Sequence, residues 1–341
     1  MEKILVINTM CIGDIVLTTP VFHVLKKNLP SSHIVMLTDV RYQSVLENNP
    51  NIDEFISLDK KGIHKSFNGV LKLLSEIRKR KFDLVVNLSC NERSILFTLL
   101  SGAKKKLGYA HKGQGFFLDG SVPFADIPEG KRHFADSNVD IISFLNLPDY
   151  SHNGPEIFPD AGDYRFAKEF WLKAGVGADS LVIGFNMGAN WPSKRWTENG
   201  FRAVAEKIKA KYQAEIVFFG SPEDLPLVER VTERLSFQPV IAAGKTTLRQ
   251  LSALMRRCQV ILTNDTGPMH IAVASGVRVV ALYGPSPVGS FAPYGEGNTV
   301  ICHHIDCSPC GRHECTDHRC MKEITPEEVL KEIEKCLTGK N

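Results

Sequence analysis

Short apolar runs alternate along this chain with amphipathic stretches of about 10–15 residues, and this alternation limits the fold more than any other feature. Parallel strands are buried on both faces and read as apolar runs, and each crossover between them needs a helix. The alternation therefore predicts an α/β protein with parallel sheets covered by helices. Because it occurs twice, we expect two doubly wound, Rossmann-like domains.

The expected elements divide into two groups on either side of a linker. Strands are predicted in the first half at 3–8, 33–38, 54–58, 82–88 and 105–109, with a helix around 70–80, and in the second half at 181–187, 215–219, 239–242, 259–263 and 278–283, with helices near 198–212, 223–235, 248–257 and 268–275. The segment 147–163 holds three prolines and two glycines and is the expected linker. We predict domains over 1–155 and 164–322 that face a central cleft, and a last helix over 326–337 that packs back on the first domain.

The composition fits a folded globular chain, with 43% hydrophobic and 23% charged residues. No apolar run approaches the roughly 18 residues that a membrane-spanning helix needs. The amino terminus lacks the pattern of a secretory signal, so a cytoplasmic location is expected.

Basic residues concentrate in the first half of the chain. Residues 60–112 hold 13 Lys and Arg against 3 Asp and Glu. Two interpretations stay open, a solvated surface or a face for an anionic partner such as an acidic sugar or an anionic membrane. Nucleic acid is not expected, because no zinc finger, aromatic RNA-binding pattern or helix-turn-helix accompanies the charge.

The first candidate loop, Thr9–Asp14, follows the first predicted strand. It lacks the glycines of a dinucleotide fingerprint, which argues against such a cofactor. Gly13 allows close approach of the backbone. Asp14 has two interpretations, a helix N-cap or a general base acting on a hydroxyl.

The second candidate loop, Gly188–Trp196, follows the first strand of the second domain. Small residues at Gly188 and Ala189, then the cations Lys194 and Arg195, suit a diphosphate. The alternative is a surface loop with packed tryptophans.

The third candidate, Thr263–His270, joins a buried strand to a helix near Pro268. The free N–H groups at such a helix start can hold an anion, and His270 could reach a phosphate or a ribose. Capping of the helix by Asp265 or Thr266 is the structural alternative. Two loops that suit anions in one domain point to a nucleotide diphosphate.

Five of the nine cysteines crowd into residues 302–320, here called the cysteine-rich segment. A zinc or iron–sulfur site, disulfides and free thiols are all open interpretations, and a structural zinc is not the favoured one. The ligands of such a site would be Cys307, Cys310, Cys315 and Cys320.

Several motifs together resemble glycosyltransferase family 9, the ADP-heptose:lipopolysaccharide heptosyltransferases. They are I-G-D-I-V-L-T-T-P-V at 12–21, G-A-N-W-P-S-K-R-W at 188–196, F-F-G-S at 218–221, N-D-T-G-P-M-H-I-A-V-A-S-G at 264–276 and A-L-Y-G-P-S at 281–286. The resemblance covers nearly the whole chain. Thr197 departs from it, because many members have proline there.

The resemblance implies a GT-B fold and metal-independent, inverting transfer of heptose from ADP-heptose to the inner core of lipopolysaccharide. By position, Asp14 matches the catalytic base and Lys194 the residue that meets the donor diphosphate. Donor binding is implied for Gly188, Glu223, Asp265, Thr266, Gly267 and His270 as well, Glu223 only weakly. The acceptor side is predicted at Gly13, Lys104, Lys105 and Lys106.

The expected partners are a nucleotide sugar, an anionic lipopolysaccharide core and, peripherally, the inner membrane, with no cofactor required. Three alternatives remain at this point: a transferase of the same fold that uses another nucleotide sugar, a noncatalytic nucleotide-sugar-binding protein, and a metal-sensing module built on the cysteine-rich segment.

Overall fold

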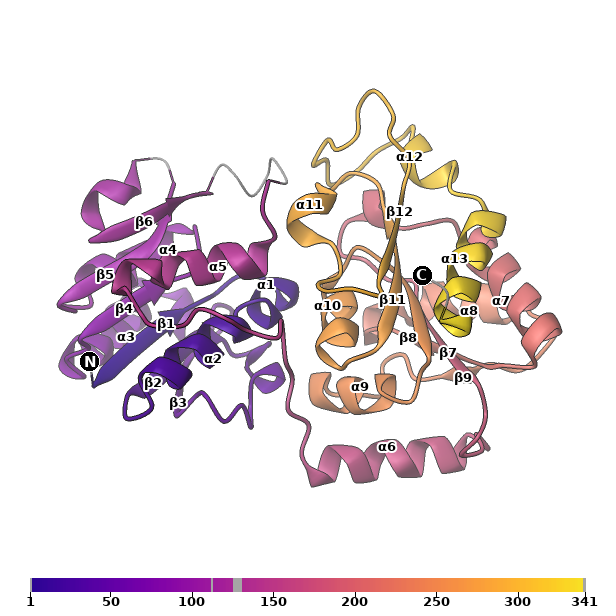
Figure 1. The fold of residues 1–341 in the computed structure, drawn as a ribbon, viewed down its shortest axis with the longest axis horizontal. Helices are drawn as coiled ribbons and strands as arrows, with labels where there is room; N and C mark the ends of the chain where they lie inside the picture. Colours follow the sequence, from indigo (N-terminus) through magenta and orange to yellow (C-terminus); the bar gives the residue numbers. More distant parts are fainter. Residues whose placement is uncertain (1, 112, 125–130, 340–341) are drawn as a thin grey trace. The chain divides into compact units, whose positions relative to one another are not determined.

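The computed structural model describes residues 2–111, 113–124 and 131–339 and divides into two compact units, Met1–Phe158 and Pro159–Asn341. The boundary lies inside the predicted linker. Each unit contains one parallel sheet with helices packed on it, as Figure 1 shows. Among the described residues, no helix has the length and apolar content needed to cross a bilayer.

The first unit is a doubly wound domain. Its strands are β1 (Lys3–Ile7), β2 (His33–Asp39), β3 (Glu54–Leu58), β4 (Leu84–Asn87), β5 (Lys105–Ala110) and β6 (Gly120–Pro123), and its helices are α1 (Ile12–Val16), α2 (Thr19–Asn28), α3 (Phe67–Lys79), α4 (Glu92–Leu100) and α5 (Phe134–Ile142). The strand order is β3-β2-β1-β4-β5-β6, and all the pairings are parallel. Buried residues of α3 and α4 form one apolar cluster with alternate residues of the central strands, as the period of two in a strand requires.

The second unit repeats this connectivity. Its strands are β7 (Val182–Asn186), β8 (Glu215–Phe219), β9 (Val240–Ile241), β10 (Val260–Asn264), β11 (Arg278–Tyr283) and β12 (Thr299–Cys302), in the order β12-β11-β10-β7-β8-β9. Its helices are α6 (Ala161–Lys173), α7 (Glu198–Tyr212), α8 (Leu225–Thr232), α9 (Leu248–Met255), α10 (Gly267–Ala274), α11 (Val288–Phe291), α12 (Arg319–Lys322) and α13 (Pro326–Thr338).

The last helix corrects one prediction. α13 begins as expected, with Thr325 as its N-cap, but it packs on α7 and on the strands β10 and β11. Figure 1 shows α13 beside α7 within the second unit. Its buried residues Val329, Ile333 and Cys336 belong to the core of that unit, so the expectation that it packs back on the first domain is wrong.

Each sheet has one point at which the strand order reverses, between β1 and β4 in the first unit and between β7 and β10 in the second. Loops that leave the carboxyl ends of these strands diverge there, and open α/β sheets bind ligands at such points. Asp14 follows β1, and Asp265 follows β10, so both predicted sites lie at a reversal point.

Candidate active site

Asp14 is the third residue of α1, and it contributes to the start of that helix without being its N-cap. Cys11 is the N-cap residue, and the Asp14 carboxylate accepts the backbone N–H of Cys11 at 3.1 Å. This is the side-chain half of a capping box. Because Asp14 is only partly buried, capping and action on a bound hydroxyl are compatible roles for its carboxylate. Gly13 precedes it and is buried.

Side chains from the loop after β4 hold the loop that leads to Asp14. The backbone N–H of Thr9 donates to the Ser89 hydroxyl at 2.8 Å, and the Asn91 amide donates to the Thr9 hydroxyl at 2.8 Å. The Asn8 amide donates to the Asp14 carbonyl at 3.1 Å. The backbone around Asp14 is therefore braced from both sides of the reversal point.

The structure places the predicted acceptor-side lysines at the opposite end of the sheet. Lys105 is in register with Leu84, and Leu84 with Ile4, so it lies level with the beginning of β1. Lys104 binds the Asp83 carboxylate at 2.7 Å at this amino-terminal edge. Lys105 and Lys106 donate to carbonyl groups of the same unit. Strand direction therefore separates Lys104, Lys105 and Lys106 from Asp14, and their place on the acceptor side stays a prediction.

Tyr109 marks the other end of β5 and is nearer to Asp14. Burial raises its pKa well above the usual value, and negative charge on Cys90, Asp140 and Asp14 adds to the effect. Because β5 runs parallel to β4 and β1, its carboxyl end, and not its lysine-bearing beginning, lies at the same edge of the sheet as Asp14.

A charged cluster that the sequence did not predict lies at the carboxyl edge of the first sheet, the edge that holds Asp14. Asp39 ends β2, is fully buried, and accepts two hydrogen bonds from the Arg41 guanidinium at 2.9 and 2.7 Å. Lys60 lies 3.6 Å from the same carboxylate and donates to the Thr9 carbonyl. Burial alone would raise the pKa of Asp39, but the Arg41 hydrogen bonds bring it below its ordinary value of 3.8. The contact of Lys60 with Thr9 places this cluster beside the loop that leads to α1.

In the second unit, the structure brings two predicted motifs together. The ammonium of Lys194 lies 2.6 Å from the carboxylate of Asp265 and 4.8 Å from the centre of the Trp191 ring. Lys194 is in the loop after β7, Asp265 follows β10, and these strands are neighbours at the reversal point. Because an ammonium has three N–H donors, a Lys194 oriented by Asp265 keeps donors for phosphate oxygens.

A buried amide fixes the two loops to each other. Asn264, the last residue of β10, accepts the backbone N–H of Trp196 at 3.0 Å and donates to the Met187 carbonyl at 2.7 Å. Its side chain is fully buried. Asn264 therefore sets the position of the Lys194 loop relative to Asp265.

Asp224, the residue after Glu223, lies against the backbone of Gly188. A Cβ atom on Gly188 would overlap the carboxylate of Asp224, whereas Glu223 is exposed. Asp224 accepts the backbone N–H of Ser221 at 2.9 Å and its hydroxyl at 2.8 Å. The spacing of Ser221 and Asp224 is that of a capping box, which is visible in the sequence, but the approach of Asp224 to Gly188 is visible only in the structure.

The other members of the third motif lie at the start of α10. Thr266 is the N-cap residue and makes no side-chain capping bond, and Gly267 is the first helical residue. His270 is buried within the first turns of the helix. Because α10 follows the carboxyl end of β10, its first N–H groups lie at the same edge of the sheet as Lys194.

The cysteine-rich segment braces the Lys194 loop through Ser193, which is buried. The Ser193 hydroxyl donates to the Arg312 carbonyl at 2.6 Å, and its N–H donates to the His313 carbonyl at 3.3 Å. The Nε2 atom of His318 lies 2.9 Å from the Ser193 carbonyl, to which it can only donate. No local pattern in the sequence indicates these contacts, which join residues more than 100 positions apart.

The cysteine prediction has a mixed outcome. All nine cysteines are free thiols, so the disulfide alternative is wrong. Burial, followed by the charges of Cys310, Cys315 and Cys307, raises the pKa of Cys320 to about 11, so these thiols are near one another. Within residues 2–111, 113–124 and 131–339, however, no group of three or more His, Cys, Asp or Glu side chains is arranged to hold a metal ion.

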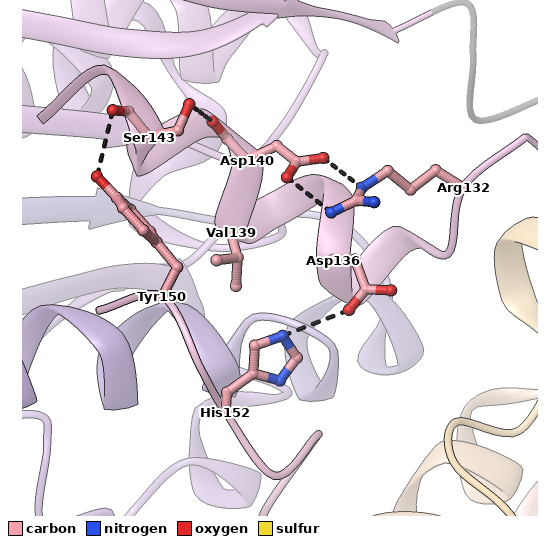
Figure 2. Close-up of a pocket in the computed structure, with 7 residues that line it drawn as sticks. All are labelled: Arg132, Asp136, Val139, Asp140, Ser143, Tyr150 and His152. Carbon is pink, nitrogen blue, oxygen red and sulfur yellow. Dashed lines mark hydrogen bonds and ion pairs between the residues drawn. The ribbon is translucent and has the colours of Figure 1, made fainter. Parts of the chain in front are cut away.

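A cavity of about 290 Å³ in the first unit contains none of the predicted site residues. Figure 2 shows its lining, which comes from α5, from the residues that flank this helix and from the chain that leaves the unit: Arg132, Asp136, Val139, Asp140, Ser143, Tyr150 and His152. Its charges pair with one another, Arg132 with Asp140 and Asp136 with His152. We assign this cavity to the packing of the departing chain on α5.

Comparison with known proteins identifies the family of this chain. Residues 70–320 match the family described as glycosyltransferase family 9 (heptosyltransferase). This chain belongs to glycosyltransferase family 9. A crystal structure of a family 9 glycosyl transferase from Veillonella parvula is similar to it with 35% identity and a TM-score of 0.91, over 99% of this chain and 98% of that one.

Other members agree with this assignment. Lipopolysaccharide heptosyltransferase 3 of Escherichia coli K12 is 26% identical over 95% of both chains. The structure of E. coli ADP-heptose lps heptosyltransferase II shares the fold, with a TM-score of 0.80 and 23% identity over 99% of both chains. The chain is therefore a glycosyltransferase with the GT-B type of α/β fold, as its motifs predicted.

Proposed function

We propose that this family 9 protein transfers heptose from ADP-heptose to the inner core of lipopolysaccharide, with inversion at the anomeric carbon. The observation that best supports binding of the ADP-heptose donor is the Lys194–Asp265 pair at the reversal point of the second sheet, beside the start of α10. A cation and a helix start at one sheet edge suit a nucleotide diphosphate. The names of two E. coli relatives, lipopolysaccharide heptosyltransferase 3 and ADP-heptose lps heptosyltransferase II, support the sugar and the acceptor class.

The acceptor hydroxyl loses its proton to the Asp14 carboxylate in this mechanism. The hydroxyl oxygen attacks the anomeric carbon of the donor, the bond from that carbon to the diphosphate oxygen breaks, and ADP leaves with the bonding electron pair. A single base is sufficient for inversion. The Cys11 N–H orients the Asp14 carboxylate through the capping bond.

Negative charge on the diphosphate grows as the bond to the sugar breaks. Lys194 and the first N–H groups of α10 stabilise that charge more strongly in the transition state than in the ground state, which is what accelerates the reaction. Asp265 orients Lys194, and Asn264 holds the loop that carries it. We propose that these protein groups stabilise the leaving group without a metal ion.

The acceptor side is proposed to include the carboxyl edge of the first sheet, where Arg41 and Lys60 gather on Asp39 beside the loop that leads to α1. Cations at this edge suit the acidic sugars of a lipopolysaccharide core. We place the protein in the cytoplasm, in peripheral contact with the inner membrane that carries such an acceptor.

The test is to incubate the purified protein with ADP-heptose and a panel of truncated core acceptors, and to identify the linkage of the product. Competition among ADP- and UDP-sugars tests the donor. Transfer of another sugar in preference to heptose would overturn the donor assignment. Tight binding of ADP-heptose without turnover on any acceptor would favour a noncatalytic binding protein.

A further inference from the structure

The segment that links β3 to α3 exposes large apolar side chains in an ordered part of the first unit. Ile63 is 71% exposed, Phe67 76% and Leu71 43%. Phe67 and Leu71 are four residues apart in α3 and share a face of the helix. The same helix buries Val70 and Leu73 in the core, so its exposed apolar residues are additional to those that the fold needs.

Local contacts hold this segment in a defined shape. The Asp59 carboxylate accepts the backbone N–H groups of Gly62 at 2.8 Å and Lys61 at 3.2 Å, which shapes the turn before Ile63. The Ser66 hydroxyl caps α3 by accepting the Gly69 N–H at 3.1 Å. Gly69 packs so tightly that a Cβ atom there would overlap the Ile63 carbonyl, so the turn containing Ile63 rests directly on the helix.

Apart from the Asp59 carboxylate, which is bonded to backbone N–H groups of the turn, the charged side chains next to these apolar residues are positive. Residues 60–75 include Lys60, Lys61, Lys65 and Lys72 and no acidic residue. Lys61, Lys65 and Lys72 are exposed. Lysines that surround exposed Phe, Leu and Ile side chains are typical of surfaces that lie in the headgroup region of an anionic bilayer, because the apolar groups enter the acyl boundary while the ammonium groups stay with the phosphates.

We propose that this basic–apolar surface, defined as Lys61, Ile63, Lys65, Phe67, Leu71 and Lys72, docks on the anionic lipid bilayer that holds the acceptor. The inference rests on the proposed function, because it assumes a lipid-anchored acceptor. A protein partner fits less well, since lysine is depleted at protein interfaces and enriched at anionic membranes.

The position of the surface relative to Asp14 supports this assignment. β3 and β1 run in the same direction, so the turn after β3 and the loop after β1 lie at the same edge of the sheet. Lys60, next to the surface, donates to the carbonyl of Thr9 in the loop that leads to Asp14. Docking of this edge would bring the candidate base toward the headgroup layer, where the acceptor sugars are.

The experiment measures sedimentation of the full chain with vesicles of phosphatidylcholine alone or mixed with phosphatidylglycerol. We expect binding to the mixed vesicles, weakened at least about tenfold in the triple variant I63S/F67S/L71S. The variant K61Q/K65Q/K72Q should bind the mixed vesicles more weakly, by roughly fivefold for each lysine replaced, and this loss of binding should be smaller at high salt. The matched control is Leu172→Ser on α6, a residue that is 66% exposed and lies outside the surface; it should bind like the parent.

Activity on two acceptors separates this proposal from the proposed function. Both surface variants should keep parental turnover on a water-soluble truncated acceptor and lose turnover on an acceptor embedded in vesicles. Parental vesicle binding by both variants would overturn the docking surface, as would equal binding to neutral and anionic vesicles. A change of oligomeric state in the variants without a change in vesicle binding would assign the surface to a protein interface instead. A parent that binds anionic vesicles through this surface but transfers no sugar to either acceptor would contradict the proposed function alone.

Discussion

The two units share one strand connectivity, and their reversal points carry different chemistry. In the first unit, the loop after β1 ends in a short helix with the partly exposed carboxylate of Asp14. In the second, the loop after β7 carries Lys194, which is paired with the nearly buried Asp265. The sheet therefore supplies the same location twice, and the loops decide whether it holds a partly exposed carboxylate or a lysine paired with a buried one.

The units also differ in which segments of the chain hold these loops. The Asp14 loop is tied by residues near the neighbouring strand ends, Ser89 and Asn91. The Lys194 loop is tied by Asn264 and, through Ser193, by a segment more than 100 residues away. Both loops are therefore preorganised, the first by residues close to it in the fold of the sheet and the second also by a distant segment of the chain.

The largest expected effect tests the base of the first unit. Asp14→Asn should lower turnover at least about a hundredfold and leave donor affinity little changed. Asparagine still offers an oxygen to the Cys11 N–H, so the helix start is preserved and only the basicity is lost. Steady-state kinetics and a donor-binding titration measure the two effects. Parental turnover would make Asp14 a capping residue only.

The next largest effect tests the cation of the second unit. Lys194→Ala should weaken ADP-heptose binding and turnover together, each by roughly tenfold or more, because the diphosphate loses a charged donor. Calorimetric titration with ADP and initial rates provide the measurements. Lys207→Ala is the matched control, since Lys207 pairs with Glu327 on an exposed surface of the same unit. Equal effects of Lys194→Ala and Lys207→Ala would contradict a specific role of Lys194 in donor binding.

The buried charge of the first unit should affect stability more than catalysis. Asp39→Asn should lower the free energy of unfolding by about 2 kcal/mol, because Arg41 loses a charged acceptor. The folded-state pKa of Asp39 is below 3.8, so its contribution is present at neutral pH and is lost as the pH falls through that folded-state value. Denaturant unfolding of parent and variant from pH 7 to pH 3 should show their difference shrinking at the acid end. A constant difference would contradict the charge explanation.

A smaller effect tests the brace on the Lys194 loop. His318 has a positive φ of 57°, a conformation that asparagine tolerates better than glutamine. Glutamine, however, can place a donor where Nε2 of His318 meets the Ser193 carbonyl, and asparagine is too short. We expect His318→Gln to keep the parental KM for the donor and His318→Asn to raise it a few-fold. If His318→Gln raised the donor KM and His318→Asn did not, the backbone conformation of residue 318 would matter and the hydrogen bond would not.

The smallest expected effect is at the amino-terminal edge of the first sheet. Replacing Lys104, Lys105 and Lys106 together by Gln should change the acceptor KM less than about twofold, because these side chains lie at the far end of β5 from Asp14. Removing Arg41 and Lys60 should raise the acceptor KM more. If the triple variant had the larger effect, the acceptor would have to reach the opposite edge of the sheet.

Much of the fold was predictable because the signals are local. The apolar runs located the central strands, and Thr325 with Pro326 located the start of α13. Among the elements for which no range was predicted, three have an identifiable reason. β6 contains glycine and proline, β12 has only four residues, and α6 begins inside the proline-rich linker. The capping box of Asp160 and Asp163 marks the start of α6 and was readable in the sequence.

The sequence by itself determined the repeated α/β pattern and the residues that follow each central strand, including Asp14, Lys194 and Asp265, because strand periodicity and loop chemistry are short-range properties. Only the tertiary structure decided which end of β5 the lysines occupy, that α13 covers α7, and that His318 holds Ser193. These outcomes depend on strand direction and on contacts between distant segments, which pack according to shape and hydrogen bonding that no local pattern encodes.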